Sequence, residues 1–310
     1  MSQPEAGTSR KRLFSREDYL APPAVPTGQP PNRPTAQPPK DVLNTIWRKN
    51  EVFLDIGSYS IGSAIMVIWP LLLFIWMGWY TTLDPIYWLG FMCFCGIPIL
   101  ILLHSLTQPV PPPVRFNRQR REVCVPQKDG SYWIVPWEQV TAAATAVSSV
   151  GQHGRTTQGL LVVGFTNPDP NAKEVNRHFS LGFSCGGGTT AMCLWECMRS
   201  YMEIGPEAVP DTRLGKQPYE KTQIGSIVTS LRKGDIKDVL HGLFFVIFLG
   251  TYFAEKLQNL KLAPPPNLTD PSIVEWSQPL PPEQWAKRSP ELERAIAERE
   301  AELASERVTA

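Results

Sequence analysis

Two long apolar runs dominate the hydrophobic pattern of this chain. They cover residues 56–80 and 86–106, and Asp84 is the only Asp, Glu, Lys or Arg between Ile56 and Val114. Each run has at least the roughly twenty residues that an α-helix needs to cross a bilayer. Only the short segment Thr-Thr-Leu-Asp-Pro separates them, so we expect a two-helix transmembrane hairpin over residues 54–107.

The charges on either side of this hairpin predict its orientation. Lys and Arg residues precede it and follow it, whereas its turn contains neither. Cytoplasmic segments carry the excess of Lys and Arg in membrane proteins, and Trp and Tyr gather at headgroup level. Trp79, Tyr80 and Trp88 flank the turn in agreement with this rule. Both flanks are therefore expected in the cytoplasm.

After residue 113 the pattern changes to that of short strands followed by one helix. The helix is expected over Thr189–Glu203, where Met192, Trp195, Met198 and Met202 share one face and Thr189 or Thr190 is available as the N-cap. Strands separated by Gly, Pro, Asn or Asp are expected over residues 114–125, 132–135, 140–150, 159–165 and 177–183. This order predicts an α+β domain over residues 114–204.

The remaining segments are polar or Pro-rich, with one exception. Residues 1–45 are expected to be a disordered Pro-rich leader, and residues 205–238 a linker with a basic helix. The exception is the apolar run 239–254, which is either a third transmembrane helix or an in-plane helix, and the cations before it favour crossing. In the crossing case residues 255–310, a Pro-rich spacer and a helix over Pro290–Val308 capped by Ser289, lie on the far side.

The strand region also carries a resemblance. The strings RFNRQRREVCV and YWIVPWEQV, joined by an Asp-Gly turn and placed directly after a two-helix hairpin, resemble the membrane-anchored pleckstrin-homology-like domains of bacteria. More narrowly, residues 54–203 are similar to an uncharacterised proteobacterial inner-membrane family, some members of which are encoded near type VI secretion genes. The resemblance implies antiparallel strands capped by a C-terminal helix, in the cytoplasm of a bacterium and held at its inner membrane. That family provides no catalytic residues to carry over.

Composition and motifs argue against several classes of activity. A net charge of +1 gives no field that would attract nucleic acid. No Ser-His-Asp set, carboxylate pair or nucleotide motif is visible, so we expect neither an enzyme nor a cofactor. The four His residues show no metal-binding spacing, and Cys193 and Cys197, although i and i+4, have no second pair of ligands nearby. No disulfide is expected in the cytoplasm.

One cluster of cations is a candidate binding site. Arg115, Arg118, Arg120 and Arg121 follow the hairpin and are candidates for contact with anionic lipid headgroups, where each cation contributes about 1 kcal/mol. The alternative is that they serve as a topology signal and solvated surface.

Three further features have structural interpretations. Gly186–Gly188 is expected to be a turn rather than an anion cradle, and Asp84 a turn former. His104 and His241, each at the end of an apolar run, are expected at the membrane interface, with contact between them as the alternative.

Binding is therefore the expected function, with the lipid bilayer as one partner. The family resemblance implies an immunity or accessory protein for a secreted antibacterial toxin of the type VI kind. The alternative is a membrane scaffold or lipid-surface sensor without a toxin partner. A transporter is disfavoured because the apolar runs contain almost no polar groups for a pathway.

Overall fold

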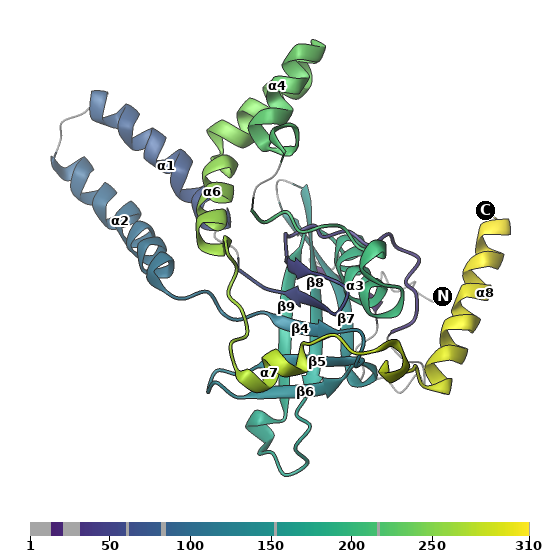
Figure 1. Cartoon of the computed structure of the whole chain (residues 1–310). Helices are drawn as coiled ribbons and strands as arrows, with labels where there is room; N and C mark the ends of the chain where they lie inside the picture. Colours follow the sequence, from purple (N-terminus) through teal and green to yellow (C-terminus); the bar gives the residue numbers. More distant parts are fainter. Residues whose placement is uncertain are drawn as a thin grey trace, which may run out of the picture. The chain divides into compact units, whose positions relative to one another are not determined.

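The chain folds into two compact units. The computed structural model describes residues 14–20, 32–59, 62–81, 85–151, 154–215 and 218–309 (Figure 1). Unit 1 takes its described residues from 1–56, 114–211 and 270–310, and unit 2 from 57–113 and 212–269. The chain therefore leaves unit 1 twice, and both times it returns.

Unit 1 contains a five-stranded antiparallel sheet with the order β2-β3-β4-β5-β6. Val, Ile, Phe and Trp side chains of these strands form one half of the core, as half-buried strands require. The strands are β2 (Ile46–Lys49), β3 (Phe53–Ile56), β4 (Val114–Asn117), β5 (Glu122–Pro126) and β6 (Tyr132–Pro136).

The second sheet of unit 1 has the order β1-β7-β8-β9 and is also antiparallel. Its strands are β1 (Phe14–Leu20), β7 (Thr141–Gly151), β8 (Gly154–Thr166) and β9 (His178–Cys185), and helix α3 (Gly188–Glu203) follows directly. Trp195, Met198 and Tyr201 of α3 are fully buried in one core with both sheets. The stacked rings of Trp137 and Trp195, 5.6 Å apart, lie in this core.

The helical hairpin is an insertion between two neighbouring strands. Ile56 at the end of β3 and Val114 at the start of β4 are paired in the antiparallel ladder. Between them the chain forms α1 (Gly62–Thr81) and α2 (Pro85–Thr107), which contact each other in unit 2. The two strands therefore pair at the point where the chain enters and leaves the hairpin.

The second excursion of the chain completes unit 2. It consists of η4 (Tyr219–Lys221), α4 (Gln223–Lys233), α5 (Ile236–Gly242), the π-helix η5 (Leu243–Phe248) and α6 (Thr251–Leu262). Gly234 and Gly250 have φ of 75°, a left-handed conformation that glycine adopts without strain, and each interrupts the helical path. The last segment returns to unit 1 as α7 (Pro271–Trp276) and α8 (Pro290–Thr309).

Four short 3-10 turns complete the described secondary structure of unit 1. They are η1 (Trp137–Gln139), η2 (Glu174–Asn176), η3 (Pro206–Ala208) and η6 (Pro282–Gln284).

Several expectations from the sequence are confirmed. The α+β class, the hairpin of two helices, the turn at Gly130 and helix α3 with its buried Met and Trp face are all present. Ser289 caps α8, because the Leu292 N–H donates to its Oγ at 3.2 Å. Helix α3, however, starts after Gly187 with no side-chain cap, so neither Thr189 nor Thr190 is its N-cap.

The prediction of one strand over residues 114–125 is wrong. Residues 118–121 form a turn between β4 and β5. The Asn117 Oδ1 accepts hydrogen bonds from the Gln119 and Arg120 N–H groups, and Arg121 has φ of 53°. This side chain to backbone bonding favours a turn without Gly or Pro.

The prediction of a disordered leader over residues 1–45 is wrong where the structure describes this segment. Residues 14–20 form β1, which pairs with β7. The Asn32 Nδ2 donates to the Trp137 carbonyl at 3.1 Å, and the Thr35 hydroxyl donates to Glu196 at 2.7 Å. Specific polar contacts thus hold this Pro-rich segment, although its apolar content is low. Residues 1–13 and 21–31 lie outside the described ranges.

The C-terminal segment contradicts the expectation that everything after Lys256 lies across a membrane from residues 114–204. Residues 270–309 belong to unit 1. The Arg288 Nε lies 2.6 Å from the Glu203 carboxylate, and the Ala286 N–H donates to the Gln119 carbonyl at 2.8 Å. Segments in direct contact share one side of any membrane. The packing of residues 270–309 on unit 1 therefore disagrees with an arrangement in which residues 239–254 cross once and carry the C-terminal segment to the far side.

Candidate functional site

Helix α6 holds unit 2 together by packing along α1. The Trp69 ring lies 4.2 Å from the Phe253 ring, and its Nε1 donates to the Ile247 carbonyl at 3.1 Å. A Cβ on Gly250 would lie 2.7 Å from Trp69, so only glycine fits here. Further along α6, the Gln258 amide donates to the Tyr59 carbonyl at 3.3 Å. Contacts from Gly250 to Gln258 therefore follow α1 from Trp69 back to the base of the hairpin.

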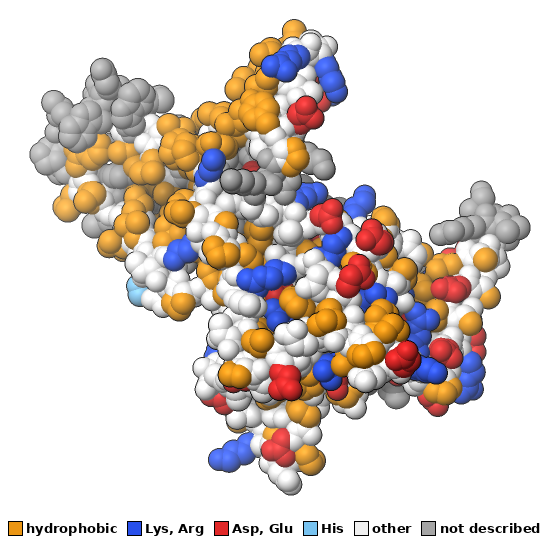
Figure 2. All heavy atoms as spheres, viewed as in Figure 1, with side chains coloured by type: hydrophobic (Ala, Val, Ile, Leu, Met, Phe, Trp, Pro, Cys, Tyr) orange, Lys and Arg blue, Asp and Glu red, His pale blue; other side chains and the backbone are white. Residues whose placement is uncertain are grey.

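Unit 2 exposes an unusual amount of apolar surface. Val67 of α1 is 68% exposed, and Leu89 and Ile101 of α2 are 69% and 64% exposed. The second excursion adds exposed side chains from Ile236, Leu240, Leu243, Phe244, Phe245, Ile247 and Phe248. Figure 2 shows hydrophobic side chains gathered over α1 and α2, whereas unit 1 shows many charged ones. Apolar patches of this kind mark contacts with a membrane or a protein partner.

The described helices can be compared with the length and apolar composition that a membrane span needs. Within the described ranges, no single helix is both long and apolar enough to cross a membrane. Helices α5 and η5 (Ile236–Phe248) together with α6 satisfy the length and composition criteria as a pair, across a bend of 55° at the break before Thr251. The helical hairpin is thus established, while its crossing of a membrane stays a prediction.

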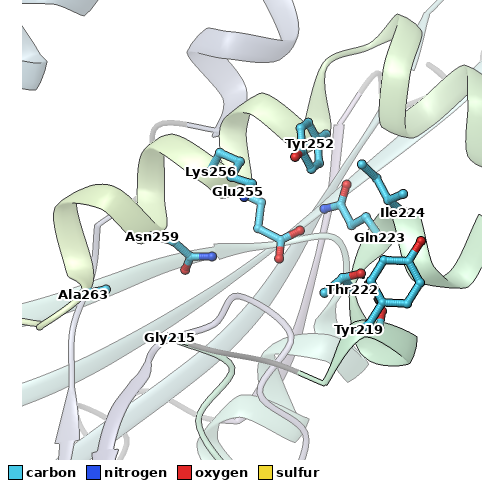
Figure 3. Close-up of a pocket in the computed structure, with 10 residues that line it drawn as sticks. All are labelled: Gly215, Tyr219, Thr222, Gln223, Ile224, Tyr252, Glu255, Lys256, Asn259 and Ala263. Atoms are coloured by element: carbon cyan, nitrogen blue, oxygen red, sulfur yellow. Dashed lines mark hydrogen bonds between the residues drawn. The ribbon is translucent and has the colours of Figure 1, made fainter.

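A cavity of about 480 Å³ lies in unit 2 between α6 and the η4–α4 turn (Figure 3). Tyr252, Glu255, Lys256 and Asn259 come from one side of α6, at the i, i+3, i+4 and i+7 positions that share a helix face. The opposite wall is formed by Tyr219, Thr222, Gln223 and Ile224, with Gly215 and Ala263 at the margins. Several polar side chains therefore line this cavity. We call this the α6 cavity.

The comparison with protein families gave a match to DUF6708, a family of unknown function, over residues 91–270. The matched segment covers more than half of the chain. The protein belongs to the DUF6708 family. The match includes most of α2, strands β4–β9, α3 and the whole second excursion. The comparisons with curated proteins and with solved structures gave no match.

The four arginines of this DUF6708 protein do not form a common surface. Arg115 and Arg121 have side chains only 3% and 8% exposed. The Arg115 Nε lies 2.6 Å from Asp55, and its guanidinium stacks 3.8 Å over the Phe53 ring. Arg118 and Arg120 are half-buried and donate to the carbonyls of Ile204 and Trp276. For Arg115 and Arg121 the prediction of lipid contact is wrong, because burial requires charged partners within the protein.

Glu203 is the centre of a buried polar cluster that the sequence did not reveal. Its carboxylate, 1% exposed, accepts from the Trp137 Nε1 at 2.7 Å, the Arg121 Nη2 at 2.9 Å and the Arg288 Nε at 2.6 Å. These partners come from three separate parts of the chain. The cluster therefore ties helix α3 and the C-terminal segment to the five-stranded sheet.

Glu138 joins the C-terminal segment to the same cluster. Burial alone would raise the pKa of its carboxyl, but the Ser289 N–H at 3.0 Å and the Arg121 guanidinium at 3.2 Å outweigh burial. The pKa of Glu138 is therefore held below its ordinary value. Glu138 is ionised at neutral pH and stabilises the start of α8.

The described cysteines of unit 1 are unsuited to act as nucleophiles or metal ligands. Burial raises the pKa of the Cys124 thiol to about 12 and raises the pKa of Cys197 as well. Thiols are nucleophilic or metal-binding as thiolates, so these groups are inert at neutral pH. Cys193 and Cys197 are buried on α3, and among the described residues no three His, Cys, Asp or Glu side chains converge as a metal site requires.

The histidines at the ends of the apolar runs and the Gly186–Gly188 segment have contacts that explain them as structural residues. His104 lies 3.3 Å from the Gln108 amide, and His241 stacks on Phe245 at 4.4 Å, so the two histidines have different neighbours. Gly187 approaches β8 closely: a Cβ on Gly159 would lie 2.1 Å from its carbonyl oxygen. This agrees with a turn at Gly186–Gly188. Asp84 and His153 lie outside the described residues.

The α6 cavity is not evident from the sequence. Its signal was a single carboxylate, Glu255, in a segment that also places Tyr252 and Asn259 on the same helix face. Its other wall, at Tyr219–Gln223, comes from a turn about thirty residues earlier in the chain. Periodicity within one helix does not predict such a partner.

Proposed function

We propose that this protein is a membrane-anchored binding protein whose unit 2 embeds in the bacterial inner membrane and whose unit 1 is the binding module in the cytoplasm. The observation that carries the proposal is the exposed apolar surface of unit 2. Helices α1 and α2, with 20 and 23 residues, are apolar on all sides. The apolar runs of the sequence that contain them, residues 56–80 and 86–106, have the roughly twenty residues that a membrane span needs. The proposal therefore rests on these runs and on the exposed apolar surface, since no single helix within the described ranges meets both requirements for a span.

The connectivity supports the same arrangement. Both excursions start and end in unit 1, so unit 1 stays on one side while unit 2 carries the apolar surface. Lys and Arg residues concentrate before and after the hairpin, which favours the cytoplasmic side for unit 1. In this arrangement the bent pair α5–η5 and α6 enters the membrane without delivering the C-terminus to the other side.

The strand order supports a pleckstrin-homology-like binding module. Strands β3–β6 form a four-stranded meander, β7–β9 form a three-stranded meander, and α3 closes the core. The resemblance implies antiparallel strands capped by a C-terminal helix, and these two meanders with α3 agree with that coarser expectation. Strands β2 and β1 are added, one at the edge of each sheet. A role as an immunity or accessory protein for a type VI-type toxin rests on the resemblance. Its test is whether co-expression protects cells from the product of an adjacent toxin gene.

A role as a lipid-surface sensor that binds headgroups through all four arginines is disfavoured, because two of the four are buried in ion pairs. Arg115 and Arg121 are enclosed by Asp55, Glu138 and Glu203. The alternative function, which involves no toxin partner, is that of a membrane scaffold that binds other proteins through unit 1.

Membrane fractionation tests the anchoring. The full chain is expected to stay in the membrane pellet after a carbonate wash. A triple variant Val67→Asp, Leu89→Asp, Ile101→Asp is expected to leave it, because each Asp in an apolar membrane helix opposes insertion, by up to about 3 kcal/mol at the helix centre. The control is Val175→Asp, a residue of unit 1 that is 91% exposed and should tolerate the change. Recovery of the wild-type chain in the soluble fraction would refute the anchoring.

A further inference from the structure

The α6 cavity contains a carboxylate without a partner. Within the part of the chain that the structure describes, Glu255 makes no hydrogen bond and no ion pair, although it is half-buried and lines the cavity. In contrast, the Thr222 hydroxyl donates to the Tyr219 carbonyl at 2.6 Å, and the Gln223 Oε1 accepts from Thr251 at 3.0 Å. The walls are thus fixed, while the Glu255 carboxylate has no protein partner among the described residues. A half-buried carboxylate of this kind is suited to a cationic ligand.

The other free groups specify the ligand further. Figure 3 shows Glu255 and Asn259 directed from α6 toward the opposite wall, with the Tyr219 and Tyr252 rings at one end. Aromatic faces and a carboxylate together favour an ammonium group. Lys256 lines the same cavity, with its Nζ 5.6 Å from the Tyr252 ring centroid, and provides a cation for an anionic group of the ligand. The cavity therefore suits a zwitterion that carries both charges.

The position of the cavity within unit 2 indicates where this ligand would come from. Residues 252–259 lie between two fixed points, Gly250 beside Trp69 and Lys261, whose Nζ donates to the Gln108 carbonyl at 3.4 Å. Tyr59 and Gln108 are at the base of the hairpin, at the opposite end from its turn. If unit 2 is embedded as proposed above, this base lies at the level of the lipid headgroups.

We propose that the α6 cavity binds a phosphoethanolamine group, with its ammonium on Glu255 and its phosphate on Lys256. The group is carried either by a lipid headgroup or by a soluble glycerophosphodiester, and a volume of about 480 Å³ accommodates either head. The headgroup source rests on the proposed membrane anchoring, whereas the recognition chemistry does not. The helical path is interrupted at η5 and Gly250, directly before the cavity. Such π-helical segments and broken helices recur at functional positions, which supports a binding site here.

Titration of the purified full chain with sn-glycero-3-phosphoethanolamine tests the recognition. We expect saturable heat of binding, weakened at least about tenfold in Glu255→Gln, which equals about 1.4 kcal/mol. Asp238→Asn, an exposed carboxylate of unit 2 outside the cavity, is the matched control and should bind as the wild type does. Among the residues that the structure describes, Glu255 makes no hydrogen bond or ion pair that the substitution would break, so the variant should fold.

A second probe isolates the ammonium. sn-Glycerol 3-phosphate lacks it and should bind at least about tenfold more weakly than the phosphoethanolamine compound. Equal binding of the two probes, equal binding by Glu255→Gln, or no binding of the first probe would overturn the proposal.

Reconstitution distinguishes the sources of the ligand. In nanodiscs of mixed phosphatidylethanolamine and phosphatidylglycerol, a lipid ligand predicts retention of phosphatidylethanolamine by the wild type through delipidation and its loss in Glu255→Gln. Binding of the soluble probe without retained lipid assigns the site to a soluble ligand. The binding expected in the titration does not depend on the result of the carbonate wash. The membrane anchoring and the ligand recognition can therefore fail separately.

Discussion

At the scale of single residues, the structure changes the meaning of the charged positions. The sequence identified the four arginines because they are close together, but it could not identify their partners. Asp55 and Glu203 lie about 60 and 80 residues from the arginines that they bind. Local spacing predicts neighbours on a helix or strand and carries no signal for such long-range ion pairs. The sequence therefore identified the arginines as interacting residues, but the prediction that Arg115 and Arg121 are exposed was wrong.

Replacement of Glu203 by Gln should strongly destabilise unit 1. Removal of one member of a buried ionic cluster leaves the other uncompensated, at a cost of about 3 kcal/mol. Arg121, with 8% of its side chain exposed, would lose Glu203 and keep Glu138 as its charged partner, and Arg288 would lose the same carboxylate. Urea unfolding monitored by Trp fluorescence measures the change. Glu207→Gln, at an exposed position on the same connection, should leave the midpoint unchanged. Equal midpoints for the two variants would contradict the cluster's stabilising role.

The Glu138 carboxyl should make stability depend on acidic pH. Its pKa is lower in the folded chain than its ordinary value of 4.5. The carboxylate therefore stabilises the fold above about pH 4.5, and this contribution is lost as the pH falls through the folded-state pKa. Urea midpoints of the wild type and Glu138→Gln should differ at pH 7 and converge toward pH 3. Parallel profiles over this range would show that Ser289 and Arg121 do not hold the carboxylate.

At the scale of elements, local chemistry predicted most helices and strands and failed at particular residues. The segment 114–125 has the composition of one strand, yet the Asn117 side chain turns the backbone after β4. The basic helix and third apolar run were also predicted as separate straight elements. Gly234 and Gly250 instead divide the region into α4, α5–η5 and α6. An isolated Gly in an apolar run does not reveal whether the helix continues, because packing against residues such as Trp69 decides it.

The close approach of β8 to the start of α3 gives a test at this scale. Gly159→Ala should destabilise unit 1 by about 1–3 kcal/mol, the usual cost of overpacking, because the new methyl would lie 2.1 Å from the Gly187 oxygen. Gly182→Ala on the neighbouring strand is the control, since its Cβ would meet nothing within 4 Å. Thermal unfolding of both variants measures the difference. An unchanged melting temperature for Gly159→Ala would show that the strand and helix are further apart.

At the scale of the whole molecule, the sequence predicted the hairpin and the α+β domain but not how they are joined. Strand β1 pairs with β7 about 130 residues later, and residues 270–289 contact β4, β5 and the end of α3. Pro-rich segments contain no periodic pattern that would identify such partners. The number of membrane crossings could not be predicted for the same reason.

Reporter fusions at the two ends of the chain test this connectivity. The described residues nearest each end of the chain, 14–20 and 290–309, belong to unit 1. Reporters at Met1 and Ala310 should therefore be active in the same compartment, which we expect to be the cytoplasm. A reporter inserted after Thr81, at the turn of the hairpin, should respond from the opposite compartment. Termini that report opposite compartments would show that the C-terminal segment does not pack on unit 1.

The pairing of Ile56 with Val114 also has a consequence for biosynthesis. A ribosome must add 57 residues after β3 before the partner strand β4 emerges. During those seconds β2 and β3 have an unpaired edge, and the intervening helices are already available to the insertion machinery. Docking of Arg288 onto Glu203 comes later still, near the end of translation. Nascent chains stalled between these points should therefore engage lipid before they acquire a protease-resistant sheet.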